Sequence, residues 1–313
     1  MADRLLMMHE PLTLSEYQRR SQRTDNFPQS DDDGIDPLLG PLLGLAGEIG
    51  TLLASYKKRL RDGVAYELFG DNVAEELGDI LWYTANVADK AGLSLDEIAR
   101  RNLAKTADRW PARGGESPKR RKLSEHFDAG LSRKHQLPRT FAVTIRPTAS
   151  DGPEPLIEVI WNGKRVADNL GDNTYDDSGY RYHDAFHLAN AAVLGWSPVA
   201  RNKIFDCKRP EGTMADTVED GGRAIVIEEA IAAFMFAYAR QHNFLEDVRH
   251  LDYHALKTFQ TFTAGLEVAQ RHLWEVEQAV LQGFDAWRQL RENKGGDLRG
   301  DLAARKLTYA PLA

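Results

Sequence analysis

The chain has 313 residues, enough for two domains that each bury a core of their own. Its formal net charge of −7 argues against a dedicated nucleic-acid-binding protein, whose binding domain is usually basic. A single cysteine, Cys207, excludes an internal disulfide. With no signal sequence and no apolar run of membrane length in view, we expect a cytoplasmic protein that does not meet a membrane.

The first third of the chain predicts an all-α bundle. Four helices are expected, over about residues 12–23, 38–60, 72–91 and 95–109. Thr13 or Ser15 suits the N-cap of the first helix, and Ser94 suits that of the fourth. Gly63 and Gly92 stop the second and third helices, because glycine readily adopts the conformations that end a helix.

Carboxylates gather on the second and third of these helices. Glu76 and Asp79 are three residues apart, so both side chains leave one helix face about a turn from each other. Glu48 stands on the preceding helix. Solvated surface acids are the alternative, but apolar neighbours such as Ile80 and Leu81 make these helices core elements. A divalent cation offsets the repulsion between the acids, because magnesium prefers carboxylate oxygens.

The neighbouring acid Glu75 points about 100° away from Glu76 around the helix. It is either an outer ligand or general base, or a solvated side chain. Lys58 and Arg59 end the second helix, where they either meet substrate or pair with the negative end of the helix dipole.

A polar and basic stripe on the fourth helix completes the pattern. It consists of Asn102, Lys105 and Arg109, spaced i, i+3 and i+7. Such side chains bind phosphate oxygens through charge-assisted hydrogen bonds, and the alternative is an exposed polar face. Acids for a metal together with bases for phosphates indicate a nucleotide site.

This series of motifs resembles the MazG-like, all-α nucleoside triphosphate pyrophosphohydrolases over about residues 12–110. Segments 14–18 and 93–98 are also similar to the family. The resemblance rests on E-x-x-D at Glu76 and Asp79 and on N-x-x-K-x-x-x-R at Asn102, Lys105 and Arg109. One motif departs from the pattern, since the E-x-x-E that starts at Glu48 ends in Thr51.

The resemblance implies a Mg²⁺-dependent enzyme, with Mn²⁺ as an alternative ion, that cleaves a nucleoside triphosphate to the monophosphate and pyrophosphate. In that reading Glu48, Glu76 and Asp79 bind the metal, and Glu75, Glu76 and Asp79 are catalytic. Substrate is held by Lys58, Arg59, Asn102, Lys105 and Arg109. The family pairs its bundles, so a homodimer or higher homo-oligomer is expected. Because Thr51 replaces an acid, the site has one metal-binding carboxylate fewer than the family motif. The rival hypothesis is therefore a catalytically weakened module that senses nucleotide and controls the C-terminal domain.

Beyond residue 110 the character of the chain changes. Residues 111–137 are basic and rich in Pro and Gly, and because no aromatics interleave with the charges they predict a linker rather than a phosphate or nucleic-acid patch. Residues 138–313 predict an α+β, mostly helical domain. Its strands are expected over 140–145, 156–161 and 164–168, with a hairpin turn at Asn162-Gly163, and its helices over about 180–194, 219–241 and 248–290. The last segment is either two helices or one exposed helix.

A second group of chemically active side chains falls in this C-terminal domain. His183 and His187 are four residues apart, so one cation could bridge them on a helix. Glu228 and Glu229 interrupt another apolar helix and could complete a site. The alternative is a pair of core histidines bonded to the same glutamates. The C-terminal domain is thus either a controlled partner of the nucleotide domain or a metal-dependent hydrolase itself.

Overall fold

The chain divides into two units, Met1–Thr106 and Ala107–Ala313. The computed structural model describes residues 11–28, 36–110, 126–148, 156–166, 170–172, 174–175 and 177–312. The basic run of the predicted linker, residues 111–125, and the end of the third predicted strand, residues 167–168, lie outside the described residues.

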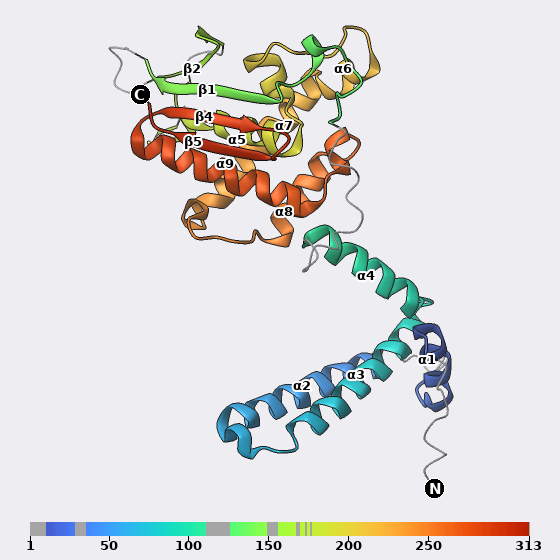
Figure 1. The fold of residues 1–313 in the computed structure, drawn as a ribbon. Coiled ribbons are helices and arrows are strands. Elements are labelled where there is room, and N and C mark those ends of the chain that lie inside the picture. Colours follow the sequence, from blue (N-terminus) through green and yellow to red (C-terminus); the bar gives the residue numbers. More distant parts are fainter. Residues whose placement is uncertain are drawn as a thin grey trace. The chain divides into compact units, whose positions relative to one another are not determined.

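The first unit is helical throughout its described part, as predicted. Its elements are α1 (Leu14–Ser21), η1 (Gln22–Thr24), α2 (Leu39–Asp62), η2 (Gly63–Ala65), α3 (Phe69–Lys90) and most of α4 (Leu95–Arg109), whose last three residues belong to the second unit. In Figure 1, α2 and α3 run side by side as an antiparallel pair. The Thr13 side chain accepts a hydrogen bond from Glu16 N at 3.1 Å, which confirms the predicted N-cap of α1.

Close packing of α2 on α3 depends on a glycine. A Cβ atom at Gly44 would lie 2.2 Å from the ring of Tyr83, so only a residue without a side chain fits this crossing. The turn between α3 and α4 is tied to α1 by Gln18, which donates to Leu93 O at 2.9 Å and accepts from Leu95 N at 2.8 Å. These contacts hold α1, α2 and α3 against one another, and the acids described below lie on α2 and α3.

A five-stranded antiparallel sheet is the framework of the second unit. Its strand order is β3-β2-β1-β4-β5, built from β1 (Thr140–Pro147), β2 (Ile157–Trp161), β3 (Lys164–Arg165), β4 (Gly296–Asp301) and β5 (Lys306–Ala310). Asn162 and Gly163 both have positive φ, which confirms the predicted hairpin turn between β2 and β3. The sequence did not predict β4 and β5, which join the sheet beside β1.

Helices supply the remainder of this unit, which is therefore α+β and mostly helical, as predicted. The longer ones are α5 (Asp184–Ala189), α6 (Met214–Glu219), α7 (Gly222–Arg240), α8 (Tyr253–Phe262) and α9 (Leu273–Asn293). Short helical turns are η3 (Arg133–His135), η4 (Tyr180–Tyr182), the π-helical η5 (Asn190–Leu194) and η6 (Ala200–Ile204), η7 (Asn243–Leu245) and η8 (Glu267–Gln270).

The core of the second unit lies between the sheet and α9. Helices α5 and α9 pack on each other and on β4 and β5 (Figure 1). Phe284, Trp287 and Leu290 of α9 are completely buried. The 248–290 segment is therefore two helices, one of the two predicted alternatives, and the second of them is a core helix rather than an exposed one.

Candidate functional site

Helices α2 and α3 bring Glu48 and Glu76 to the same hydroxyl, with Asp79 near enough for its charge to act on Glu48. Among the described residues, the ligand atoms of Glu48, Glu76 and Asp79 do not all lie within 4.8 Å of one another, as those of a formed metal site would. The hydroxyl of Thr51 on α2 lies 2.5 Å from Glu76 Oε2 on α3 and 3.3 Å from Glu48 Oε2. One hydroxyl proton serves one acceptor at a time, so Thr51 donates to the nearer Glu76. Thr51, which stands where the family motif has its second glutamate, therefore faces the acids and links the two helices.

The electrostatics of this cluster show how crowded its acids are. Partial desolvation, a hydrogen bond with the Glu76 carboxyl group and the negative charges of Asp79 and Glu76 raise the pKa of Glu48, and only the Thr51 hydroxyl opposes them. Burial and the charge of Asp79 likewise raise the pKa of Tyr17 on α1. Three helices thus contribute to the cluster.

The types of side chain in this group suit a divalent cation. Three carboxylates and a hydroxyl present the hard oxygen ligands that Mg²⁺ and Mn²⁺ accept. No lysine or arginine forms an ion pair with Glu48, Glu76 or Asp79 among the described residues, so their charges are left for a cation to neutralise. Glu75 is exposed on α3 and forms no hydrogen bond or ion pair with these acids within the described part of the chain.

The predicted substrate-binding cations at the end of α2 lie apart from the acids along the helix. Glu48 and Arg59 are separated by about 16 Å of helix axis at 1.5 Å per residue. Arg59 donates to Gly63 O at 2.6 Å and lies over the Phe69 ring, while Lys58 lies over the Tyr66 ring. Their role in substrate binding stays a prediction.

The stripe on α4 divides into two parts. Asn102 and Lys105 are exposed, and neither has a hydrogen bond or an ion pair to any residue that the structure describes. The guanidinium of Arg109 lies 4.5 Å from the centre of the Trp110 ring and 5.0 Å from that of Tyr253, all within the second unit. Asn102 and Lys105 are therefore the members of the stripe that are free to meet a ligand.

The second predicted cluster also assembles, inside the second unit. His183 precedes α5, His187 lies within it, and both approach Glu229 of α7. Glu228, the preceding residue, is completely buried behind His187. Burial by itself lowers the pKa of His187, but the Glu228 and Glu229 carboxylates raise it well above its usual value.

Sequence reasoning missed the residues that support both clusters. Tyr17 stands beside Asp79, and its only signal was its place in a family-like segment. Asn190 and Ser197 bind Glu228, yet their positions beside it follow only from tertiary packing. The Asp172 carboxylate accepts from Gly179 N at 2.7 Å and fixes the loop that leads to His183.

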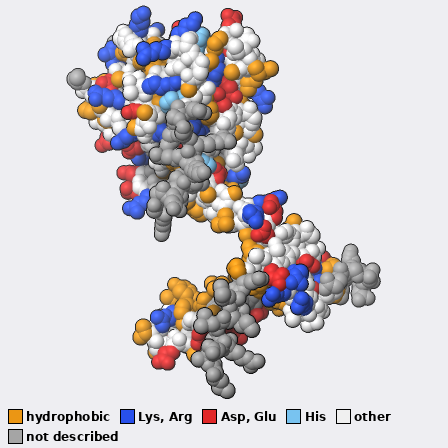
Figure 2. All heavy atoms as spheres, turned by 45° about the vertical axis from the view of Figure 1, so that its right-hand side comes forward, with side chains coloured by type: hydrophobic (Ala, Val, Ile, Leu, Met, Phe, Trp, Pro, Cys, Tyr) orange, Lys and Arg blue, Asp and Glu red, His pale blue; other side chains and the backbone are white. Residues whose placement is uncertain are grey.

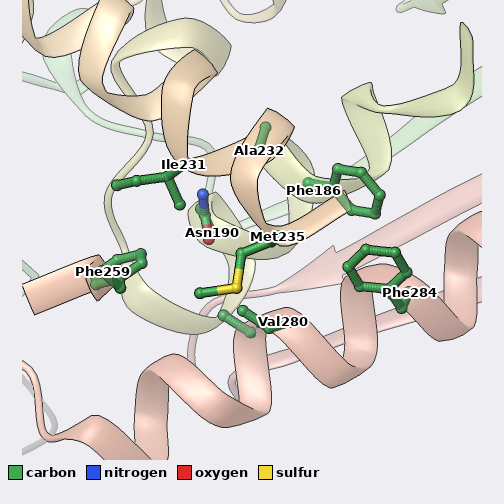
Figure 3. Close-up of a pocket in the computed structure, with 9 residues that line it drawn as sticks. Phe186, Asn190, Ile231, Ala232, Met235, Phe259, Val280 and Phe284 are labelled. Carbon is green, nitrogen blue, oxygen red and sulfur yellow. The ribbon is translucent and has the colours of Figure 1, made fainter. Parts of the chain in front are cut away.

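A small cavity beside α7 is too apolar and too small for a nucleotide. It measures about 20 Å³, room for about one water, and Figure 3 shows it enclosed by Phe186, Met235, Phe259 and Phe284. Asn190 is its one polar side chain, and the amide nitrogen of that residue donates to Glu228.

Two family models match the chain. Residues 43–114 match the MazG nucleotide pyrophosphohydrolase domain, and residues 122–313 match the MazG C-terminal domain. The chain therefore belongs to the MazG family and carries a nucleotide pyrophosphohydrolase domain followed by that C-terminal domain.

A phage protein extends the comparison. Over 96 residues, 30% of this chain, the sequence is 36% identical to the Gene 37 protein of Mycobacterium phage L5, and the match covers 84% of that protein. No solved structure matches the chain. Among the described residues, no helix has the length and apolar character needed to cross a membrane.

Proposed function

We propose that the first unit hydrolyses a nucleoside or deoxynucleoside triphosphate to the monophosphate and pyrophosphate in a Mg²⁺-dependent reaction. The observation that carries this proposal is that Thr51 of α2 contacts both Glu48 and Glu76, while the charges of Glu76 and Asp79 on α3 help to raise the pKa of Glu48. The family assignment supports a nucleotide pyrophosphohydrolase rather than another phosphate-binding function.

Bound magnesium would neutralise polyphosphate charge and lower the pKa of an attacking water. The chain's own residues hold this site in shape. Thr51 fixes one oxygen of Glu76 and keeps it directed toward Glu48. Lys105 and Asn102 offer exposed donors for phosphate oxygens, and Glu75 is the nearest acid in sequence for accepting a proton.

The first unit also supports a proposed homodimer. Large apolar side chains are exposed along α2, with Leu43 at 64%, Leu53 at 63% and Leu60 at 69% of their full accessibility. Figure 2 shows hydrophobic side chains gathered on the surface of the helical unit. A continuous apolar stripe on one helix is typical of a surface that a second protein surface covers, and a second copy of this chain supplies a matching stripe.

The reaction is tested by incubating the purified full chain with Mg²⁺ or Mn²⁺ and each common nucleoside triphosphate. Products are separated by ion-exchange chromatography. We expect at least one substrate to yield monophosphate and pyrophosphate rather than diphosphate and phosphate. Glu76→Gln and Asp79→Asn should each lower turnover by more than tenfold, a loss of about 1.4 kcal/mol or more of transition-state stabilisation.

Glu67→Gln is the matched control, because Glu67 is an exposed acid just before α3 and outside the cluster. It should keep the wild-type rate. Binding of a triphosphate without turnover by the wild-type chain would instead favour the sensing module, which Thr51 at the expected acid position would explain. Equal rates in Glu76→Gln and Glu67→Gln would contradict the assignment of the acids.

A further inference from the structure

Two histidines and a glutamate direct ligand atoms at a common point in the second unit. Glu229 Oε2 lies 3.8 Å from His183 Nε2 and 3.5 Å from His187 Nε2. The ligand atoms of the three residues all lie within 4.8 Å of one another. This cluster is separate in sequence from the acids of the first unit, to which the function proposed above is assigned.

The other ring nitrogen of each histidine faces an oxygen that fixes the ring. His183 Nδ1 lies 3.0 Å from Tyr180 O, and the His183 ring stacks on the Tyr180 ring at 4.5 Å between centres. His187 Nδ1 lies 3.1 Å from Glu228 Oε1. A backbone carbonyl and a carboxylate behind two imidazoles are the usual supports of metal-binding histidines, because they leave Nε2 with its lone pair toward the ion.

Glu228 is held for this supporting position. One of its oxygens accepts from Asn190 Nδ2 at 3.1 Å, and the other accepts from Ser197 Oγ at 3.0 Å and Val199 N at 2.9 Å. Three donors to a completely buried carboxylate hold it in one orientation. Glu228 is therefore a positioning residue for His187 rather than a ligand itself.

His187 has an unmet bonding requirement. Its side chain is completely buried. Nδ1 faces Glu228 Oε1 at 3.1 Å and Nε2 faces Glu229 Oε2 at 3.5 Å, but neither contact is an aligned hydrogen bond. Leaving a buried polar group unpaired costs about 1–3 kcal/mol, so such groups usually have a partner that is an ion, a water or a ligand. The alternative is a protonated imidazole held between Glu228 and Glu229 by charge alone.

The separations suit a small transition-metal ion. Ligand atoms about 2.0–2.1 Å from a tetrahedral zinc ion lie about 3.3 Å from one another, whereas an octahedral arrangement brings neighbours to about 3.0 Å. The observed 3.5 Å and 3.8 Å to Glu229 are nearer the tetrahedral value, and the two histidine ligand atoms lie within 4.8 Å of each other, so the three side chains would move slightly inward around an ion. Imidazole nitrogens also favour zinc over magnesium or calcium, which prefer oxygen.

Access from solvent is through Glu229. Its side chain is 43% exposed, against 12% for His183 and none for His187. Three protein ligands with one side open are the arrangement of catalytic zinc sites, whereas structural zinc sites are closed by four ligands. An ion here would keep a position for water or a substrate.

We propose that His183, His187 and Glu229 form a zinc-class metal site with an open coordination position, supported by Glu228. The test uses the full-length chain, stripped with a chelator and then kept in excess Mg²⁺ so that the acids of the first unit are saturated. Zn²⁺ uptake is measured by equilibrium dialysis with elemental analysis. Co²⁺ serves as a second probe, because its visible absorption reports nitrogen ligation and coordination geometry.

We expect one Zn²⁺ per chain in the wild type and in Glu76→Gln, which lacks an acid of the first unit. Glu229→Gln and His183→Gln should each weaken Zn²⁺ binding at least tenfold and abolish the Co²⁺ absorption. Glu211→Gln, an exposed acid elsewhere in the same unit, should bind as the wild type does.

Circular dichroism and thermal melts of the metal-free variants identify any that fail to fold. Of these variants, Glu229→Gln should disturb folding least, because the Glu229 side chain reaches solvent. No Zn²⁺ uptake by the wild type would overturn the proposal and leave a charge-paired histidine. Unchanged uptake by a folded Glu229→Gln or His183→Gln would overturn it as well.

Discussion

At position 51 the chain carries a hydroxyl where the family motif has a carboxylate. The structure turns this side chain into the acid cluster, 2.5 Å from Glu76 Oε2, so the substitution alters the site itself rather than a remote surface. A threonine binds a carboxylate without adding a fourth charge. The site thereby keeps its shape but attracts a cation less strongly than a four-acid cluster would.

Restoring the acid should strengthen metal binding. Thr51→Glu is expected to bind Mg²⁺ about tenfold more tightly, equivalent to about 1.4 kcal/mol. Because the added charge also repels Glu48 and Glu76, the metal-free variant should melt at a lower temperature than the wild type and gain more from Mg²⁺. Isothermal titration calorimetry and thermal melts measure both effects.

Thr51→Gln separates charge from size at this position. It should disturb the packing of the site as much as glutamate does, yet without tighter Mg²⁺ binding. If both variants bind Mg²⁺ with the wild-type affinity, Thr51 does not face the metal and the proposed ligand set is incorrect.

At the scale of elements, the close packing of α2 on α3 depends on one of the α2 glycines. Gly44 faces Tyr83, whereas a Cβ at Gly47 would meet nothing within 4 Å. Two glycines one helical turn apart therefore have opposite roles. One allows close packing, and the other only weakens the helix.

Alanine substitutions should consequently change stability in opposite directions. Gly44→Ala is expected to cost about 1–3 kcal/mol, because the methyl group forces Tyr83 or α2 to move. Gly47→Ala should gain about 0.5–1 kcal/mol, since alanine restricts the unfolded chain and favours the helix. Urea denaturation of each variant against the wild type measures the difference, and a stabilised Gly44→Ala would contradict the packing described.

At the scale of the whole molecule, the apolar stripe on α2 is the basis of the proposed dimer. Leu53→Glu places a charge in the middle of that stripe and should convert a dimer to a monomer at micromolar concentration in sedimentation velocity. Leu103→Glu on α4 is the matched control, because Leu103 is 68% exposed against 63% for Leu53. A monomeric wild type, or equal dissociation of both variants, would count against α2 as the interface.

The sequence by itself determined those features that depend on neighbouring residues. The helix starts at Thr13 and Ser94, the hairpin turn at Asn162-Gly163 and the approach of Glu76 and Asp79 all follow from local spacing and local hydrogen bonds. The acids of α2 and α3 could be grouped because a family motif had already paired them.

Only the tertiary structure decided the completion of the sheet. Strand β4 pairs Thr140 with Asp301, residues far apart in the chain, and its Gly-Asp-Leu-Arg-Gly-Asp sequence has low intrinsic strand preference. Its glycines are needed, because a Cβ at Gly296 would lie 2.1 Å from the Tyr309 ring and one at Gly300 would lie 2.1 Å from the Phe141 ring. Rings from adjacent strands occupy that space, a requirement that no local pattern reveals.

The same reason applies to the histidine cluster. Spacing alone placed His183 and His187 near each other, but it did not distinguish Glu228 from Glu229 as the residue that completes the site. Packing of α7 against α5 assigned them different roles, with Glu228 buried among three hydrogen-bond donors and Glu229 partly open to solvent. Adjacent residues on a helix point in different directions, so the environment of each is fixed by what packs against it, and that is decided only when the whole unit folds.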